Sequence, residues 1–341
     1  MSVKINTKMG ARQRSFQNYE GKDEQSIIHQ EIETPLELVD ELLSYVPEEN
    51  FKDVLDPCVG PGNMIKSIVE NKKYSSLTVY DLQKRWTETD LVKHQGIKSY
   101  HQSWLEASNI LSDWDTIKYY DLILMNPPWA KIGTQFIQKG IQSLKPGGIL
   151  IGIMDYNKMT KYTQKSPSVF NKMMKQGYFL FISTDGSRGK GGYFHGVADS
   201  IQFVFKKGTP PKDHKTVIKN RNQEYFEYVL KGNEQYVPQI PNENDYFDWD
   251  NGIKVIASPS TSTFKEEMYV VLIRKTKEKS IVKKLPVGEN VGFGGCAVKA
   301  SETDFDKVKD FFLGNCSLFY DHYVVSHGWP RFPPVRKDLL Q

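Results

Sequence analysis

Apolar residues near the start of the chain recur at the spacing of one helical face. Leu36, Val39, Leu43 and Val46 are separated by three or four positions, which predicts a helix with one buried side. The segment Thr34-Pro35-Leu36-Glu37 places threonine three positions before glutamate, with proline at the first helical position. This arrangement is typical of a capping box, so we expect the helix to begin there.

Farther along, short apolar runs alternate with amphipathic stretches. The runs have the length of buried strands, and glycine or proline often separates them from the next stretch. Strands alternating with helices are typical of βαβ units, so the sequence predicts an α/β domain with a mostly parallel sheet. The predicted strands are 53–56, 77–80, 121–125 and 149–154, and the predicted helices are 64–71 and 134–144.

The pattern changes after Tyr178. Residues 178–183 and 200–205 predict two strands around a glycine-rich loop, 185–196, and we expect them to form an antiparallel pair at the sheet edge. Beyond Lys207 the alternation with helices is lost, although 268–273 is strand-like. We therefore predict an N-terminal arm (1–30), a main domain (31–207) and a smaller C-terminal region (208–341).

The amino-acid composition restricts the class of protein but does not indicate a function. Hydrophobic residues make up 39% of the chain, enough for a packed core, and the formal charge of +4 permits a polyanionic partner without requiring one. Three cysteines are too few for a disulfide framework. The first twenty residues lack the apolar segment of a signal peptide, and no apolar run approaches membrane-spanning length. We expect a cytoplasmic protein with no membrane association.

The first candidate for chemistry is a glycine-rich turn after the first predicted strand. Asp56-Pro57-Cys58-Val59-Gly60-Pro61-Gly62 lets the backbone turn tightly and approach a ligand at the start of the next helix. Asp81 ends the following strand, where a carboxylate can accept both ribose hydroxyls of a nucleotide-like cofactor. The alternative is an ordinary turn and an ordinary strand-end aspartate.

The second candidate, Asn126-Pro127-Pro128-Trp129, follows a buried strand and is more specific. An aromatic amine is a poor nucleophile because its lone pair is delocalised into the ring. Two acceptors on its N–H bonds, the Asn126 side-chain oxygen and the Pro127 carbonyl, would localise that lone pair. The prolines stiffen the loop, and Trp129 offers a face on which a base can stack. The alternative is a proline-rich turn with a packing tryptophan.

Taken in order, Thr34-Pro35, the glycine-rich turn, Asp81 and the Asn126-Pro127-Pro128-Trp129 loop resemble the gamma class of DNA amino-methyltransferases. The resemblance covers roughly residues 30–206. It implies a Rossmann-like class I methyltransferase fold: a mostly parallel seven-stranded sheet with an antiparallel edge hairpin, followed by a smaller C-terminal target-recognition region. It also implies S-adenosylmethionine as the cofactor and direct in-line transfer of its methyl group.

The same resemblance implies roles for individual residues. Thr34 and Pro35 would border the methionine end of the cofactor, and Asp81 would bind ribose. An acidic residue usually contacts the cofactor adenine near the third strand; Ser103 stands there in this chain and is a weaker acceptor. The remaining cofactor-binding residues implied are Asp56, Pro57, Gly60 and Gly62.

A later aromatic segment, Gly192-Tyr193-Phe194-His195-Gly196-Val197, is similar to the motif that stacks on the opposite face of an extruded base. Phe194 is the candidate and Tyr193 the reserve; a core aromatic at a hairpin is the alternative. Cys58 resembles the nucleophile of cytosine-C5 enzymes, but it lies in the cofactor turn, so we interpret it as a packing residue. No histidine pair has metal-ligand spacing, and we expect no metal.

The resemblance also predicts that the binding partner of this protein is a nucleic acid. An enzyme acting on a base in duplex DNA extrudes the nucleotide, and phosphate contacts supply most of the affinity. Candidate contacts are Arg188 and Lys190 in the glycine-rich loop and Arg274 and Lys275 in a later basic cluster. A further basic cluster runs from Lys206 to Arg221. A solvated charged face is the alternative for each.

The function favoured is therefore site-specific methylation of adenine N6 in double-stranded DNA, by a monomer that acts alone or beside a cognate restriction endonuclease. Other acceptors stay open: adenine or guanine in RNA, cytosine N4, and protein glutamine. A different class also stays open, namely a non-catalytic nucleic-acid-binding module with a vestigial cofactor fold.

Overall fold

The structure is a computed structural model. The residues that it describes are 33–71, 73–94, 96–107, 119–129, 131–160, 167–184, 200–234, 236–258, 264–272, 281–289, 295–315, 318 and 333–341. Contacts between residues divide the chain into two compact units, Met1–Gly232 and Asn233–Gln341, which are described separately below.

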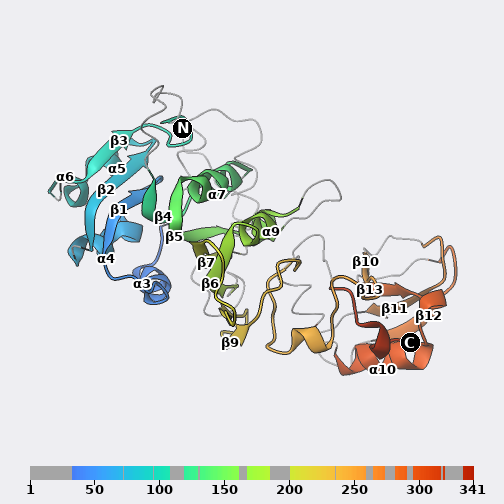
Figure 1. Ribbon diagram of the computed structural model, residues 1–341. Coiled ribbons are helices and arrows are strands. Elements are labelled where there is room, and N and C mark those ends of the chain that lie inside the picture. The colour runs from blue at the N-terminus through green and yellow to red at the C-terminus, as the bar shows by residue number, and fades with distance from the viewer. Residues whose placement is uncertain are drawn as a thin grey trace, which may run out of the picture. The chain divides into compact units, whose positions relative to one another are not determined.

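The first unit is built on a nine-stranded sheet with the order β3-β2-β1-β4-β5-β7-β6-β8-β9 (Figure 1). Neighbouring strands from β3 to β5 are parallel, β7 is antiparallel to β5 and β6, and β9 is antiparallel to β8. The strands are β1 (Phe51–Asp56), β2 (Tyr74–Asp81), β3 (Lys98–His101), β4 (Tyr120–Met125), β5 (Leu144–Asp155), β6 (Gly177–Ser183), β7 (Ser200–Lys207), β8 (Thr216–Lys219) and β9 (Tyr225–Tyr228).

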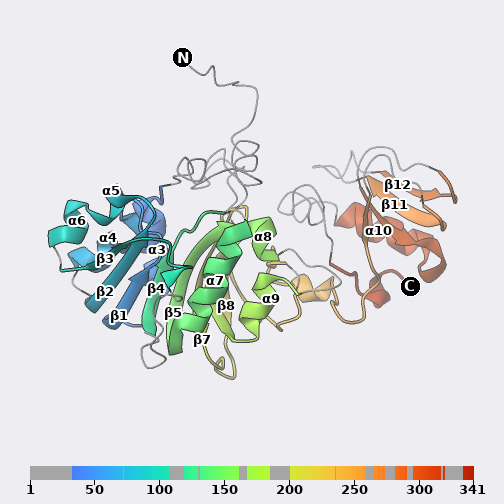
Figure 2. The same ribbon diagram turned by 90° about the horizontal axis from the view of Figure 1, so that it is seen from above.

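Helices cover both faces of this sheet, since its central strands are apolar on both sides. Ile65 of α4 and Leu38 of α3 share a buried cluster with Leu124 of β4. On the opposite face, Gly140 of α7 lies against Met125 and the β5 strand, and Figure 2 shows α7, α8 and α9 on one side of the sheet. The helices are α3 (Leu36–Ser44), α4 (Asn63–Glu70), α5 (Lys84–Thr87), α6 (Asp90–His94), α7 (Lys131–Ser143), α8 (Tyr156–Thr160) and α9 (Val169–Met174).

Each strand and helix predicted in the first unit is present, but the C-terminal edge of the sheet differs from expectation. The β6–β7 pair is antiparallel as predicted, yet it is not at the edge, because β8 pairs parallel with β6 and carries β9. These two strands extend the expected seven to nine. They also place the division between the units after Gly232 rather than near Gly208.

The start of α3 corrects one local prediction. Pro35, not Thr34, is the N-cap, and no side chain caps the helix. The buried residues of α3 are Leu38, Val39 and Leu42, whereas Leu36 is exposed. The capping-box prediction is wrong because the Thr34 hydroxyl accepts a hydrogen bond from the Asn126 side chain instead.

The sheet topology brings the predicted motifs to one edge. The chain proceeds outward from β1 through β2 and β3 in one direction and through β4 and β5 in the other. Parallel strands that diverge in this way leave a crevice at their carboxyl ends, where α/β proteins bind ligands. The glycine-rich turn follows β1, Asp81 ends β2, and Asn126 follows β4.

The second unit has its own sheet and core. Its four strands are antiparallel in the order β10-β13-β11-β12, and Val298 and Tyr269 of the sheet share a buried cluster with Phe312 of α10. The predicted strand at 268–273 is β11. The elements are β10 (Ile256–Ser258), β11 (Met268–Leu272), β12 (Ile281–Leu285), β13 (Gly295–Lys299), α10 (Phe305–Gly314) and the 3-10 turns η2 (Glu243–Asp245), η4 (Ala300–Glu302) and η5 (Lys337–Leu339).

Several predictions fall on residues that the structure does not describe. These are the N-terminal arm, the two stacking candidates and the four candidate phosphate contacts: Tyr193, Phe194, Arg188, Lys190, Arg274 and Lys275. Among the residues that are described, no helix combines the length and apolar character required to cross a membrane.

Candidate active site

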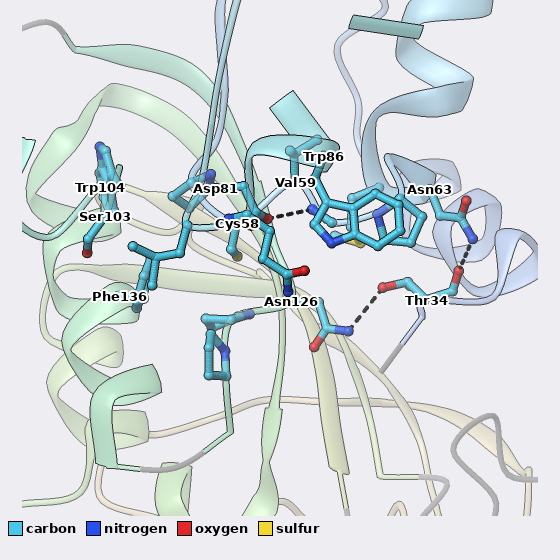
Figure 3. A pocket seen from close by; sticks show the side chains of 18 of the residues that line it. Thr34, Cys58, Val59, Asn63, Asp81, Trp86, Ser103, Trp104, Asn126 and Phe136 are labelled. Carbon is cyan, nitrogen blue, oxygen red and sulfur yellow. Dashed lines mark hydrogen bonds between the residues drawn. The ribbon is translucent and has the colours of Figure 1, made fainter. Parts of the chain in front are cut away.

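A pocket of about 400 Å³ opens at the carboxyl edge of the sheet (Figure 3). This volume lies within the usual range for sites that hold a small organic ligand. Most of the residues predicted for cofactor and catalysis line it, although they are spread over nearly a hundred positions of sequence. They are Thr34, Pro57, Gly60, Asp81, Ser103, Asn126, Pro127, Pro128 and Trp129.

The glycine-rich turn has a conformation that requires glycine. Gly60 and Gly62 have φ values of 50° and 97°, and a Cβ on Gly62 would come within 2.8 Å of the Leu91 side chain. Gly62 is the N-cap of α4, so the turn leads directly into the start of that helix. Backbone N–H groups at a helix start favour negatively charged or polar ligand atoms.

Asp81 is held by the main chain on both sides of its carboxylate. Oδ2 accepts from the Gly60 N–H at 2.9 Å, and Oδ1 accepts from the Gln83 N–H at 2.8 Å. The first bond ties the end of β2 to the glycine-rich turn (Figure 3). Because a carboxylate offers about four acceptor positions, Asp81 can receive ribose hydroxyls beside these donors.

Asp56 is not among the residues that line the pocket. It is fully buried, and its Oδ1 accepts from the Cys58 N–H at 3.0 Å, whereas Oδ2 has no partner among the described residues. Burial raises the pKa of Asp56 to about 8, and the nearby Asp81 charge acts in the same direction. We infer that Asp56 shapes the turn through its hydrogen bond from the Cys58 N–H. Pro35 and Gly62, also predicted to bind cofactor, act as helix N-caps and are not among the pocket-lining residues.

The Cys58 thiol lines the pocket but is poorly suited to nucleophilic attack. Burial raises its pKa well above the ordinary value, and the neighbouring Asp56 and Asp81 raise it further. The thiolate is the reactive form of cysteine, so this environment keeps the side chain protonated. This agrees with the interpretation of Cys58 as a packing residue.

Asn126 stands at the centre of the pocket wall, and both ends of its side-chain amide are engaged. Its Nδ2 donates to the Thr34 hydroxyl at 3.1 Å, and its Oδ1 accepts from the Trp129 indole N–H at 2.7 Å. Trp129 is only 8% exposed and belongs to the core cluster on the α3–α4 face. The edge of the indole therefore contacts Asn126, a contact that the sequence did not predict.

Ser103 lies at the end of the pocket opposite Thr34 (Figure 3). The Trp104 and Phe136 rings next to it lie 6.0 Å apart between centroids. The Lys139 ammonium lies 4.5 Å from the centre of the Trp104 ring and donates to the main-chain carbonyls of residues 104 and 105. Two aromatic side chains with a hydroxyl beside them are suited to an aromatic ring system.

Residues 39–178 match the methyltransferase small domain. This stretch contains the glycine-rich turn, Asp81 and the Asn126 loop. The match confirms the class I, Rossmann-like methyltransferase fold predicted from the sequence, and it supports S-adenosylmethionine as the cofactor. No curated protein sequence matches the chain.

Solved methyltransferase structures resemble parts of the chain at low identity. A protein from Listeria monocytogenes assigned as a class I S-adenosylmethionine-dependent methyltransferase is 17% identical, with 57% of this chain and 70% of that one covered at a TM-score of 0.41. TrmN from Thermus thermophilus is 17% identical, with 51% and 49% covered at 0.36. An rRNA methylase from Streptococcus thermophilus is 13% identical, with 52% and 99% covered at 0.35. These scores carry no information about the substrate.

The methyltransferase region also supplies pocket residues that sequence reasoning missed. Asn63, the first residue of α4, donates from Nδ2 to the Thr34 carbonyl at 2.8 Å. Trp86 of α5 lines the pocket, and its indole N–H is buried without a partner among the described residues. Trp86 follows Asp81 by five positions, and no motif marks it; only the folding of α5 over the strand ends brings it to the pocket.

Part of the predicted basic cluster serves the fold of this unit. Lys206 pairs with Glu48, and Lys207 donates to main-chain carbonyls at the end of α7. Lys219 is buried and pairs with both oxygens of Glu41 at 3.1 Å. These cations are committed to internal contacts, so they are poor candidates for binding phosphates.

Proposed function

We propose that this protein transfers a methyl group from S-adenosylmethionine to the N6 amine of adenine in DNA. The observation that carries the proposal is the position of Asn126: its side-chain amide forms part of the wall of a pocket that also contains Gly60 and Asp81. In this proposal, that position sets an acceptor for an amine beside a site suited to a nucleoside cofactor.

The residues present fit that cofactor. Gly60 leaves the turn free of a side chain where it lines the pocket, and the Asp81 carboxylate is fixed at the strand end where ribose hydroxyls are expected. The indole N–H of Trp86 is buried and has no hydrogen-bond acceptor among the described residues. Such a donor usually binds a ligand atom or a water molecule. When bound, S-adenosylmethionine supplies an electrophilic methyl group on a sulfonium sulfur.

The chain's own residues then have to make a weak nucleophile reactive. In this proposal Asn126 Oδ1 and the Pro127 carbonyl accept the two N–H bonds of the exocyclic amine, which holds the nitrogen lone pair out of conjugation with the ring. Both acceptors are fixed dipoles, so they need no reorganisation as positive charge develops on the nitrogen. Pro127 and Pro128 restrict the loop, so that the two oxygens keep their separation.

Adenine in DNA is favoured over the other acceptors by the chemistry of the loop and by the second unit. An asparagine followed by two prolines and an aromatic residue suits an amine on a flat ring. The separate unit Asn233–Gln341, with its own core, supports a role in target recognition. The basic residues that would contact phosphate belong to this proposal and lie outside the described part of the chain.

The test is to identify the methylated product. The protein is incubated with S-adenosylmethionine labelled in the methyl group and, separately, with unmethylated genomic DNA, total RNA or protein extract, and the products are hydrolysed and resolved. Label in N6-methyladenine from DNA, absent with Asn126→Ala, supports the proposal. Label confined to N4-methylcytosine, RNA or glutamine would move the activity to another acceptor, and cofactor binding without any transfer would contradict the proposal.

A further inference from the structure

The side-chain amide of Asn126 is oriented by one partner on each side. Trp129 lies on the oxygen side at 2.7 Å and Thr34 on the nitrogen side at 3.1 Å. An indole N–H can only donate, so the amide atom that faces it must be the oxygen. Turning the amide over would set two donors against each other and lose the shorter of the two bonds. The pair of contacts therefore selects a single orientation.

The two partners of the Asn126 amide, Trp129 and Thr34, are themselves held in place. Trp129 is packed into the core cluster of the α3–α4 face. The main chain of the loop lies close against the start of α7, because a Cβ on Gly133 would come within 2.5 Å of the Pro128 carbonyl oxygen. The main chain of Thr34 is fixed in turn by Asn63, which donates to its carbonyl at 2.8 Å.

The resulting chain of contacts connects the two functional loops. It begins at Asn63, directly after the glycine-rich turn, and passes through Thr34 to Asn126 (Figure 3). From Asn126 it continues to Trp129. Thr34 is buried, and in place of capping α3 its hydroxyl serves the amide. The residues implied to border the cofactor and the residue implied to hold the acceptor thus share one hydrogen-bonded network.

We propose that Trp129 and Thr34 are positioning residues that hold the Asn126 amide, with its oxygen presented for the acceptor amine. This deepens the proposed function and rests on it. Trp129 acts through the edge of its indole ring, by its N–H group, a group that phenylalanine or tyrosine at the same position would lack. Thr34 acts through its hydroxyl rather than through contact with the cofactor.

Kinetics separate this role from stacking. Trp129→Phe keeps an aromatic ring and removes the N–H, and we expect kcat to fall about tenfold, equivalent to about 1.4 kcal/mol, with little change in KM for the acceptor. A purely stacking residue would instead raise KM and spare kcat. Thr34→Val removes the hydroxyl at constant shape and should lower kcat by a similar factor, whereas Thr34→Ser should recover most of the loss. The affinity for S-adenosylmethionine, measured by calorimetry, should stay nearly constant in all three.

A spectroscopic measurement tests the hydrogen bond without any acceptor. The chain has six tryptophans, and the missing indole resonance in Trp129→Phe assigns the Trp129 N–H in a ¹⁵N-correlated NMR spectrum. Asn126→Leu removes the acceptor oxygen and should shift this resonance upfield, whereas Asn126→Asp keeps an oxygen and should not. Trp249→Phe, in the second unit, is the control and should leave the Trp129 resonance unmoved.

The methylation assay and the NMR experiment refute different claims. If no nucleic acid or protein is methylated, the proposed function falls, while the NMR experiment still decides whether the indole binds Asn126. An indole resonance that Asn126→Leu leaves in place overturns the positioning role, whatever the acceptor is. An unchanged kcat in both Trp129→Phe and Thr34→Val overturns it as well.

Discussion

Replacing Asp56 by asparagine should change how the stability of the protein depends on pH. Asp56 is fully buried at the end of β1; Oδ1 accepts from the Cys58 N–H, and Oδ2 has no partner among the described residues. Burial raises the pKa of this carboxyl from 3.8 to about 8. Asparagine has nearly the same shape, keeps the acceptor for Cys58 and cannot ionise.

Proton linkage gives the direction in which the free energy of unfolding changes with pH. Between pH 3.8 and about 8 the folded protein keeps a proton on Asp56 that the unfolded chain has lost. Its free energy of unfolding therefore falls as pH rises through this interval, by at most about 1.4 kcal/mol per pH unit from this group. The contribution is fully present below pH 3.8 and is lost as pH approaches 8. Over the whole interval the loss is on the order of 5 kcal/mol.

Urea unfolding of the wild type and Asp56→Asn at intervals from pH 4.5 to pH 8.5 measures this effect. The advantage of the variant should grow with pH, because the variant lacks the titrating group. Asp213→Asn is the matched control: it makes the same change of charge at an exposed position and should leave the two curves parallel. Parallel curves for Asp56→Asn would refute the reasoning.

Three further substitutions test separate parts of the structure. Gly62→Ala should destabilise the protein by about 1–2 kcal/mol and weaken cofactor binding. Both effects should be larger than those of Gly60→Ala, because a Cβ on Gly60 meets nothing within 4 Å. Equal effects of the two variants would contradict the clash between a Cβ on Gly62 and the Leu91 side chain. Lys219→Met should lower the free energy of unfolding in urea by about 3 kcal/mol, because the partly buried Glu41 carboxylate loses its cation and keeps the Tyr225 hydroxyl as a donor. Glu41→Gln in the same chain should recover part of this loss, and full stability of Lys219→Met would disprove the role of the ion pair. Trp86→Phe should weaken S-adenosylmethionine binding about tenfold in calorimetry, and an unchanged affinity would exclude the indole N–H as a ligand contact.

Much of the pocket could be predicted because the carboxyl ends of parallel strands share an edge. Once 53–56, 77–80 and 121–125 are read as parallel strands, the glycine-rich turn, Asp81 and Asn126 must come together, and they do. Their roles in cofactor binding and catalysis stay predictions. The methyltransferase fold itself is confirmed by the strand order and the family match.

The rest depends on contacts between distant residues that no local pattern encodes. Thr34 has the spacing of a helix cap, but an amide ninety-two positions later competes for its hydroxyl. The strands β8 and β9 are only four residues long each. In the sequence, Lys219 of β8 belongs to a basic cluster, whereas in the structure it pairs with Glu41 of α3. Charge in sequence does not show whether a lysine faces solvent or an internal carboxylate.

The central claim is that the Asn126 amide makes the acceptor amine reactive, and its most direct test is the effect of Asn126→Ala on kcat and on cofactor affinity measured with the same preparation. We predict a fall in kcat of at least about 100-fold with the dissociation constant for S-adenosylmethionine nearly unchanged. Equal losses of turnover and cofactor affinity, or a variant as fast as the wild type, would contradict the account.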